Sequence, residues 1–265
     1  MMLESEYVTI GQKKKIGEEA AALYFWTPLS KMPGDVKGVP IFSATHLTWL
    51  AIALLGCLLA VWLFRKQNGG RRVKILRLLA WILVLGCIFR IGFRIACGVF
   101  SPRWDLPLHL CDVMMFVEFY AVYSKKEFPR ELVFALGMPG ALAALITPGE
   151  IYYPFWNIYY LLFIMLHVLL FLIPVLMLAD GFVPRVRRLP GCFAFLAVLA
   201  AVDAVVNRQL KSNYLFISEA AEGSILDVIQ EMFGAWYLPA AVGMVLLIWG
   251  MLYGGVYLWR RWGRK

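Results

Sequence analysis

The segment Leu106-Pro107-Leu108-His109-Leu110-Cys111, followed by Asp112, brings an imidazole, a thiol and a carboxylate close together. Pro107 favours a helix start at this point, which places Cys111 in the first turn of a helix. The positive end of the helix dipole favours the thiolate, and the thiolate is the nucleophile of covalent acyl transfer. The spacing therefore makes Cys111 a candidate nucleophile, with packing as the plainer interpretation.

A cysteine nucleophile needs a base, and the chain holds three histidines, His46, His109 and His167. His109 is a poor base for Cys111, because residues two apart point to roughly opposite sides of a helix. His109 shares a face with Asp112, and that carboxylate would hold one tautomer of the ring. The base is therefore expected from another helix, as His167 or His46.

Further polar residues fall inside or beside the apolar stretches. Arg90 and Arg94 share one helix face, and Asp203 and Asn207 end another apolar run. Ionisable groups inside a membrane are costly and usually serve a function, so we expect them to line a polar cavity that opens outward. The arginines are candidates for binding a lipid phosphate. The alternative is that Arg90 and Arg94 pair with Asp112 and Asp203 and only stabilise the bundle.

The composition indicates the elements that must position these groups. Of 265 residues, 62% are hydrophobic and 16% are charged, and the mean hydropathy is +0.72. Soluble domains are about 45–50% apolar and about 25% charged, so we predict an all-α, polytopic membrane protein. The basic residues, 26 against 17 acidic ones, lie in short blocks between apolar runs, as the positive-inside rule predicts, and do not indicate nucleic-acid binding. The five cysteines form no CxxC pair, so we expect no disulfide framework, metal or other cofactor.

Seven apolar segments are long enough to predict transmembrane helices. They are residues 43–64, 75–99, 106–123, 131–148, 155–179, 189–206 and 235–259. Gly137, Pro139 and Gly140 predict a kink in the fourth. Residues 207–234 hold a further short amphipathic segment.

The predicted seven-helix membrane domain covers residues 43–259 and leaves a tail at each end. Residues 1–42 form an N-terminal tail with a candidate interfacial helix over Ala20–Trp26, and residues 260–265 form a basic C-terminal tail. Every second loop lies on the same side of the membrane as the C-terminus. Among the short loops, these carry most of the basic residues. This asymmetry predicts an outside N-terminus and a cytoplasmic C-terminus.

The LPLHLC segment resembles a motif of the YwaF family of bacterial integral membrane proteins. The resemblance runs from about residue 42 to about residue 240, with the family's elements in order. These are Thr45-His46-Leu47, Leu145-Ile146-Thr147-Pro148, His167, Asn207, Ser212-Asn213-Tyr214-Leu215-Phe216 and Leu226-Asp227. The family's aromatic Gly-Pro-Trp-Pro-Trp-Tyr stretch is reduced here to Gly234-Ala235-Trp236-Tyr237.

YwaF proteins are in turn similar to a eukaryotic transmembrane family of cysteine-dependent acyltransferases, which move fatty acyl chains between phospholipids to make ether phospholipids. The resemblance implies Cys111 as nucleophile and His167 as base, with Asn213 and Tyr214 near the substrate. It also implies phospholipid remodelling in a bacterial cytoplasmic membrane, with a membrane lipid or lysophospholipid as substrate.

One geometric objection keeps His46 as the second candidate base. If each span is helical throughout, Cys111 lies about 7 Å and His167 about 18 Å below the outer edge. Two other functions also stay open, a small-molecule or ion-coupled transporter and a non-catalytic structural protein. The oligomeric state is left open.

Overall fold

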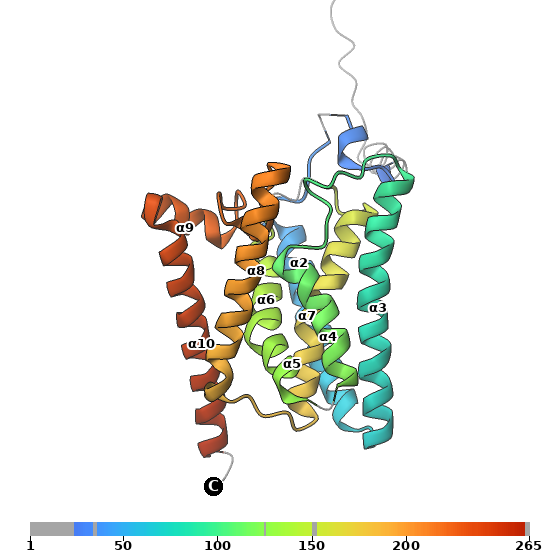
Figure 1. Cartoon of the computed structure of the whole chain (residues 1–265). Helices are drawn as coiled ribbons and strands as arrows, with labels where there is room; N and C mark the ends of the chain where they lie inside the picture. The colour runs from blue at the N-terminus through green and yellow to red at the C-terminus, as the bar shows by residue number, and fades with distance from the viewer. Residues whose placement is uncertain (1–23, 34–35, 125, 150–152, 263–265) are drawn as a thin grey trace, which may run out of the picture.

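A computed structural model describes residues 24–33, 36–124, 126–149 and 153–262 (Figure 1). All regular secondary structure in these residues is helical, which confirms the predicted fold class. The long helices are α2 (Ala44–Arg65), α3 (Gly69–Ala96), α7 (Ile158–Ala179), α8 (Leu189–Leu210) and α10 (Tyr237–Trp262). The shorter helices are α4 (Leu110–Tyr123), α5 (Glu127–Leu132), α6 (Met138–Ile146) and α9 (Ile225–Phe233). Most of the predicted Ala20–Trp26 patch lies outside the described residues.

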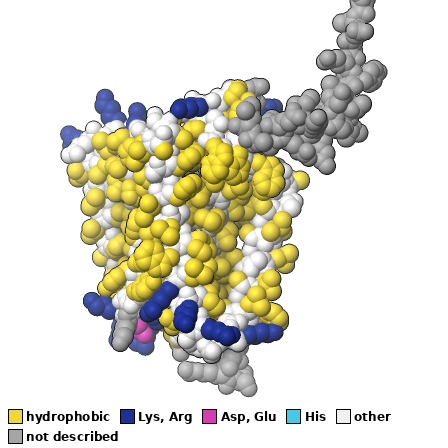
Figure 2. All heavy atoms as spheres, turned by 90° about the vertical axis from the view of Figure 1, so that its right-hand side faces the viewer, with side chains coloured by type: hydrophobic (Ala, Val, Ile, Leu, Met, Phe, Trp, Pro, Cys, Tyr) yellow, Lys and Arg dark blue, Asp and Glu magenta, His cyan; other side chains and the backbone are white. Residues whose placement is uncertain are grey.

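We call the end of the bundle where α2 and α7 begin the upper end, and the end where α4 and α7 finish the lower end (Figure 1). Within the described residues, six helical stretches are long and apolar enough to cross a membrane. These are Ala44–Arg65, Gly69–Ala96, Glu127–Ile146, Ile158–Ala179, Val186–Leu210 and Ile225–Leu258. Figure 2 shows apolar side chains over the middle of one face and Lys and Arg toward its two ends, the distribution that a bilayer requires.

The third predicted span, 106–123, differs from the expectation. Only Leu110–Tyr123 is helical, and these 14 residues measure about 21 Å, less than the ~30 Å hydrocarbon core. Leu106 to His109 form a turn, in which the N–H of Leu108 bonds the carbonyl of Leu106 at 2.8 Å. The count of seven spans therefore stays a prediction.

The fourth predicted span consists of α5, a π-helical turn η2 (Val133–Gly137) and α6 in succession. Pro139 lacks an N–H, so an α-helical hydrogen bond is missing at this point. The indole Nε1 of Trp249 in α10 donates to the carbonyl of Ala135 at 2.8 Å. The predicted irregularity is thus present as a π turn whose carbonyl is satisfied by another helix.

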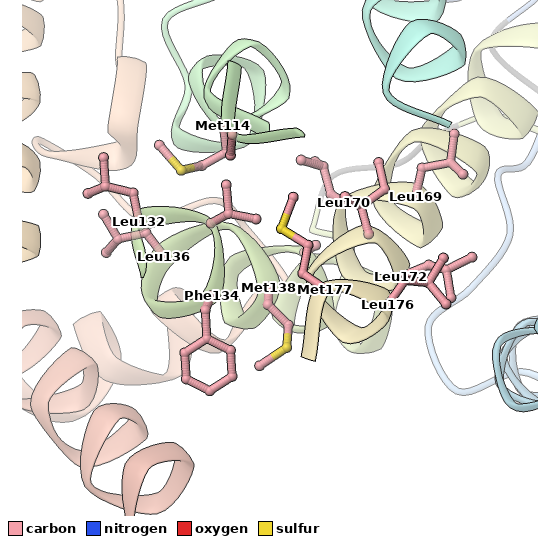
Figure 3. Packing of buried hydrophobic residues seen from close by; sticks show 14 of the residues in the cluster. Met114, Leu132, Phe134, Leu136, Met138, Leu169, Leu170, Leu172, Leu176 and Met177 are labelled. Atoms are coloured by element: carbon pink, nitrogen blue, oxygen red, sulfur yellow. The ribbon is translucent and has the colours of Figure 1, made fainter. Parts of the chain in front are cut away.

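Helix α7 is the centre of the bundle, in contact with α2, α3, α4, α6 and η2. A buried cluster joins it to α4 and to the π turn (Figure 3). Met114, Leu136, Met138, Leu170 and Met177 belong to this cluster. Helices α8 and α10 lie at the periphery, with most of their side chains turned away from the bundle.

Close packing of α3 on α7 depends on Gly86. A Cβ at this position would lie 2.8 Å from Leu166 Cδ2 and 3.2 Å from Met165 Cε. A side chain at this position would therefore force the ends of Leu166 and Met165 to move. Because Leu166 precedes His167, this contact also sets where the histidine lies relative to α3.

The lower end is held by the buried carboxylate of Glu131 in α5. Its Oε1 accepts the hydroxyl of Tyr253 in α10 at 2.5 Å and the N–H of Arg185 at 3.0 Å. The guanidinium of Arg188 lies 3.0 Å from Oε2. One carboxylate thus connects α5 to the start of α8 and to α10.

Candidate active site

Cys111 lies in the first turn of α4, which begins at Leu110, three residues after the helix start that Pro107 favours. Its side chain is half-buried and packs against the central apolar cluster. No side chain caps this helix start, and His109 occupies the N-cap position. The backbone N–H groups of this first turn therefore have no side-chain cap.

An ion pair between α3 and α4 lies beside this turn. Arg90 Nη2 is 2.6 Å from Asp112 Oδ1, which confirms the predicted pairing of these two residues. The charges of both residues act electrostatically on His109, on Cys111 and on His167. The structure thus gathers the candidate nucleophile and two of the three histidines around one ion pair.

His167 is buried in α7 and held in one tautomer. Its Nδ1 lies 2.8 Å from the carbonyl oxygen of Phe163 in the preceding turn. A carbonyl can only accept, so Nδ1 carries the proton and Nε2 carries the lone pair. This is the tautomer that a general base requires, with the ring oriented by its backbone hydrogen bond.

His46, the alternative base, has both ring nitrogens occupied. The N–H of Phe42 donates to Nδ1 at 2.8 Å, and Nε2 donates to the carbonyl of Leu145 at 3.1 Å. The buried ring therefore joins the start of α2 to the end of α6 and has no lone pair free for a proton. This geometry favours His167 over His46.

Helix α4 begins at Leu110, so the depth of Cys111 is not counted from residue 106. Cys111 precedes the last residue of α4, Tyr123, by the same 12 residues that separate His167 from Ala179, the last residue of α7. Both residues therefore lie about 18 Å above the lower ends of their helices. The objection assumed that the whole span 106–123 was helical.

The segment that leads into α4 is fixed by a second ion pair. Arg94 Nε is 2.5 Å from Asp105 Oδ1, and Asp105 Oδ2 accepts the N–H of Ser101 at 2.8 Å. Arg94 thus binds the loop and not Asp203, the partner that the sequence analysis considered. Asp105 was missed there, although a carboxylate directly before the LPLHLC segment was a visible signal.

Tyr214 holds the same segment from the other side. Its buried hydroxyl accepts the N–H of Leu106 at 3.0 Å and donates to the carbonyl of Pro102 at 2.6 Å. Burial raises the pKa of this phenol, so the hydroxyl keeps its donor proton at neutral pH. Tyr214 belongs to a short 3₁₀ turn, η4 (Tyr214–Phe216), which follows α8.

The two candidate asparagines make hydrogen bonds within the protein. Asn207 donates to the carbonyl of Tyr214 at 2.9 Å and accepts its N–H at 2.7 Å, which fixes η4 on α8. Asn213 donates to the carbonyl of Glu219 at 2.7 Å and accepts the N–H of Ser218 at 3.1 Å. Their observed contacts, like those of Tyr214, orient the loops around α4.

His109 faces η4, with its ring centroid 5.1 Å from that of Tyr214 and 4.9 Å from that of Phe216. Its Nδ1 is buried and has no hydrogen-bond partner in the described part of the chain. Asp112, the partner that the sequence suggested, is instead paired with Arg90.

Two buried carboxylates remain without hydrogen-bond partners among the described residues, Glu118 in α4 and Asp203 in α8. Glu118 lies two turns below Cys111 on the same face of α4, and its charge acts on Cys111. Across the described ranges, no group of three or more His, Cys, Asp or Glu could hold a metal ion.

The chain was compared with known proteins. No curated protein and no solved structure matches it significantly. The family model of the TMEM164 family matches residues 41–253, which include α2 to α9 and most of α10. The match covers the ion pair, both candidate bases and the candidate nucleophile. The chain therefore belongs to the TMEM164 family.

Proposed function

We propose that the protein transfers fatty acyl groups from a lipid ester through a thioester on Cys111, with His167 as the base. The observation that carries this proposal is the tautomer of His167, whose Nε2 carries the lone pair and whose helix α7 contacts α4, the helix of Cys111. Membership in the TMEM164 family, the eukaryotic ether-lipid acyltransferase family, supports it.

In the first half-reaction, Nε2 of His167 accepts the thiol proton, and Sγ of Cys111 attacks the ester carbonyl carbon. The C–S bond forms, the ester C–O bond breaks, and His167 returns the proton to the leaving lyso-lipid oxygen. In the second, His167 takes a proton from the hydroxyl of a lysophospholipid or from water. That oxygen attacks the thioester carbon, the C–S bond breaks, and the proton returns to Cys111.

The ion pair and the helix start support both steps. The carboxylate of Asp112 is within electrostatic range of His167 and stabilises the imidazolium that forms. Backbone N–H groups in the first turn of α4 are suitable donors for the oxyanion of the tetrahedral intermediate. Arg90 is paired with Asp112, and a lipid phosphate would compete with Asp112 for this guanidinium.

The membrane and its sidedness are part of the proposal. We place the protein in the cytoplasmic membrane of a bacterium, with the upper end outside. The basic residues at the lower end, such as Arg71 in the first turn of α3 and Lys126 and Arg185 in loops, support this orientation.

The test is intact-mass analysis of purified protein incubated with phospholipid. Wild-type protein is expected to carry a hydroxylamine-sensitive acyl adduct that Cys111→Ser lacks. Cys97→Ser removes the other half-buried thiol and should keep the adduct. His167→Gln should slow both formation and loss of the adduct. Equal acyl transfer by Cys111→Ser and wild type would refute the proposal.

The buried carboxylates favour a second candidate, a proton-coupled transporter. Glu118 and Asp203 are fully buried without hydrogen-bond partners in the described residues, as proton-carrying carboxylic acids of transporters often are. This function predicts gradient-driven uptake in proteoliposomes that Cys111→Ser leaves intact and Glu118→Gln abolishes. Absence of gradient-driven uptake by the wild-type protein would exclude it.

A further inference from the structure

Helix α9 has one apolar side that no other described segment covers. Ile225, Val228 and Met232 follow helical spacing, and all three are exposed, Met232 at 72% of its surface. Phe233 extends this side, and Trp236 in the following turn is 71% exposed. A soluble surface rarely carries so many large apolar side chains together.

The opposite side of α9 is occupied by contacts within the protein. Asp227 Oδ2 accepts the N–H of Gly223 at 2.7 Å, and Gln230 Oε1 accepts the N–H of Ala220 at 2.5 Å. These bonds attach the polar side of the helix to the loop before it. The direction in which α9 presents its apolar side is therefore fixed.

The level of α9 is that of the upper end of the bundle. The N–H of Ile225 donates to Thr147 Oγ1 at 3.2 Å, and Thr147 directly follows α6 at this end. Figure 1 shows α9 running across the top of α10. The loops of the same end carry three further exposed tryptophans, Trp26, Trp104 and Trp156. Exposed tryptophan at one level marks the boundary between lipid and water.

We infer that α9 is an interfacial helix, whose apolar side lies in the headgroup and acyl boundary of the bilayer at the upper end. The apolar side continues without a break into exposed residues of α10, such as Leu238, Val242 and Leu246, which lie along a membrane-length helix. The charged residues of α9, Asp227 and Glu231, are both acidic, so anionic headgroups do not attract this helix. Its binding to the bilayer therefore rests on apolar contact with lipid.

This lipid contact is connected to the candidate active site. Tyr237, the first residue of α10, donates its hydroxyl to the carbonyl of Phe216 at 2.8 Å. The ring of Phe216 lies against His109, two residues before Cys111. These contacts place the start of α10 beside η4, which packs against the N-cap residue of α4.

The test uses spin labels on two adjacent positions of the full chain in lipid nanodiscs. Met232→Cys places a label on the apolar side, and Glu231→Cys is the matched control, also exposed but toward the polar side. The background carries Cys97→Ser and Cys111→Ser, which remove the two half-buried thiols. Collision rates with oxygen, which concentrates in lipid, and with a water-soluble nickel chelate locate each label.

The inference predicts that the label at 232 collides mainly with oxygen and the label at 231 mainly with nickel. A nickel-accessible label at 232 would place the apolar side in water and overturn the inference. A label at 232 shielded from both reagents would show a protein partner or a second copy there, which also overturns it. Two oxygen-accessible labels would mean that α9 is immersed in the membrane and not interfacial.

Discussion

Replacing Tyr214 by phenylalanine should loosen the segment that presents Cys111. The ring is buried and stays, but the hydroxyl that links Leu106 and Pro102 is lost. The N–H of Leu106 and the carbonyl of Pro102 then lose their hydrogen-bond partner. Each loss lowers the free energy of unfolding by about 1–3 kcal/mol if water does not replace the hydroxyl. Both groups are partly buried, and water can replace part of the loss, so we expect about 2–3 kcal/mol.

The assay has two readings, thermal unfolding in detergent by circular dichroism and the alkylation rate of Cys111 by intact mass. A loss of 2–3 kcal/mol corresponds to a fall in Tm of about 5–10 °C for a chain of this size. Alkylation of Cys111 should be faster than in wild type, because the turn before α4 is less constrained.

Tyr237→Phe is the matched control. It also removes one phenol hydroxyl near η4, but this hydroxyl makes a single bond, to the carbonyl of Phe216. We expect a loss of about 1 kcal/mol and no change in Cys111 alkylation. Equal effects of the two substitutions on Tm and alkylation would refute the role assigned to Tyr214.

Three further predictions follow from the packing and the histidines. His46→Gln should lower Tm because two hydrogen bonds are lost, but it should keep the Cys111 adduct in mass spectra. His167→Gln should slow formation of the adduct. The reverse pattern would make His46 the base. Gly86→Ala should push α3 away from Leu166 and cost about 1–3 kcal/mol, measured as Tm, and a neutral result would contradict the close approach. Glu118→Met should raise Tm by replacing an unpartnered buried carboxyl with an apolar side chain, and a lower Tm would show that Glu118 has a stabilising partner.

The sequence predicts the helical membrane fold well, because hydropathy is local. The second predicted span, 75–99, shows the limit of this signal, since α3 begins at Gly69, capped by Asn68. The first turn of α3 is basic and not apolar, yet it is helical. Hydropathy misses such a turn because it detects only the part of a helix that lies in the hydrocarbon layer.

Pairing between helices was only partly predictable. The carboxylate nearest to Arg90 on an apolar span is Asp112, and the two residues do pair. Arg94, one turn away, instead bonds Asp105, because the loop after α3 folds back over the end of that helix. Loop conformation depends on contacts with η4, which lies 100 residues further along the chain.

By itself the sequence determined the all-helical membrane fold and the approximate positions of its long apolar helices, and it offered the Arg90–Asp112 pair as one alternative. These features depend on apolar length and residue charge, both of which are visible locally. The tertiary structure favours His167 over His46 as the proposed base, since a ring's tautomer depends on the atoms that surround it. It also decided that α4 begins only at Leu110, because the turn before it is held by Tyr214 and Asp105, whose partners are brought together only by the folded bundle.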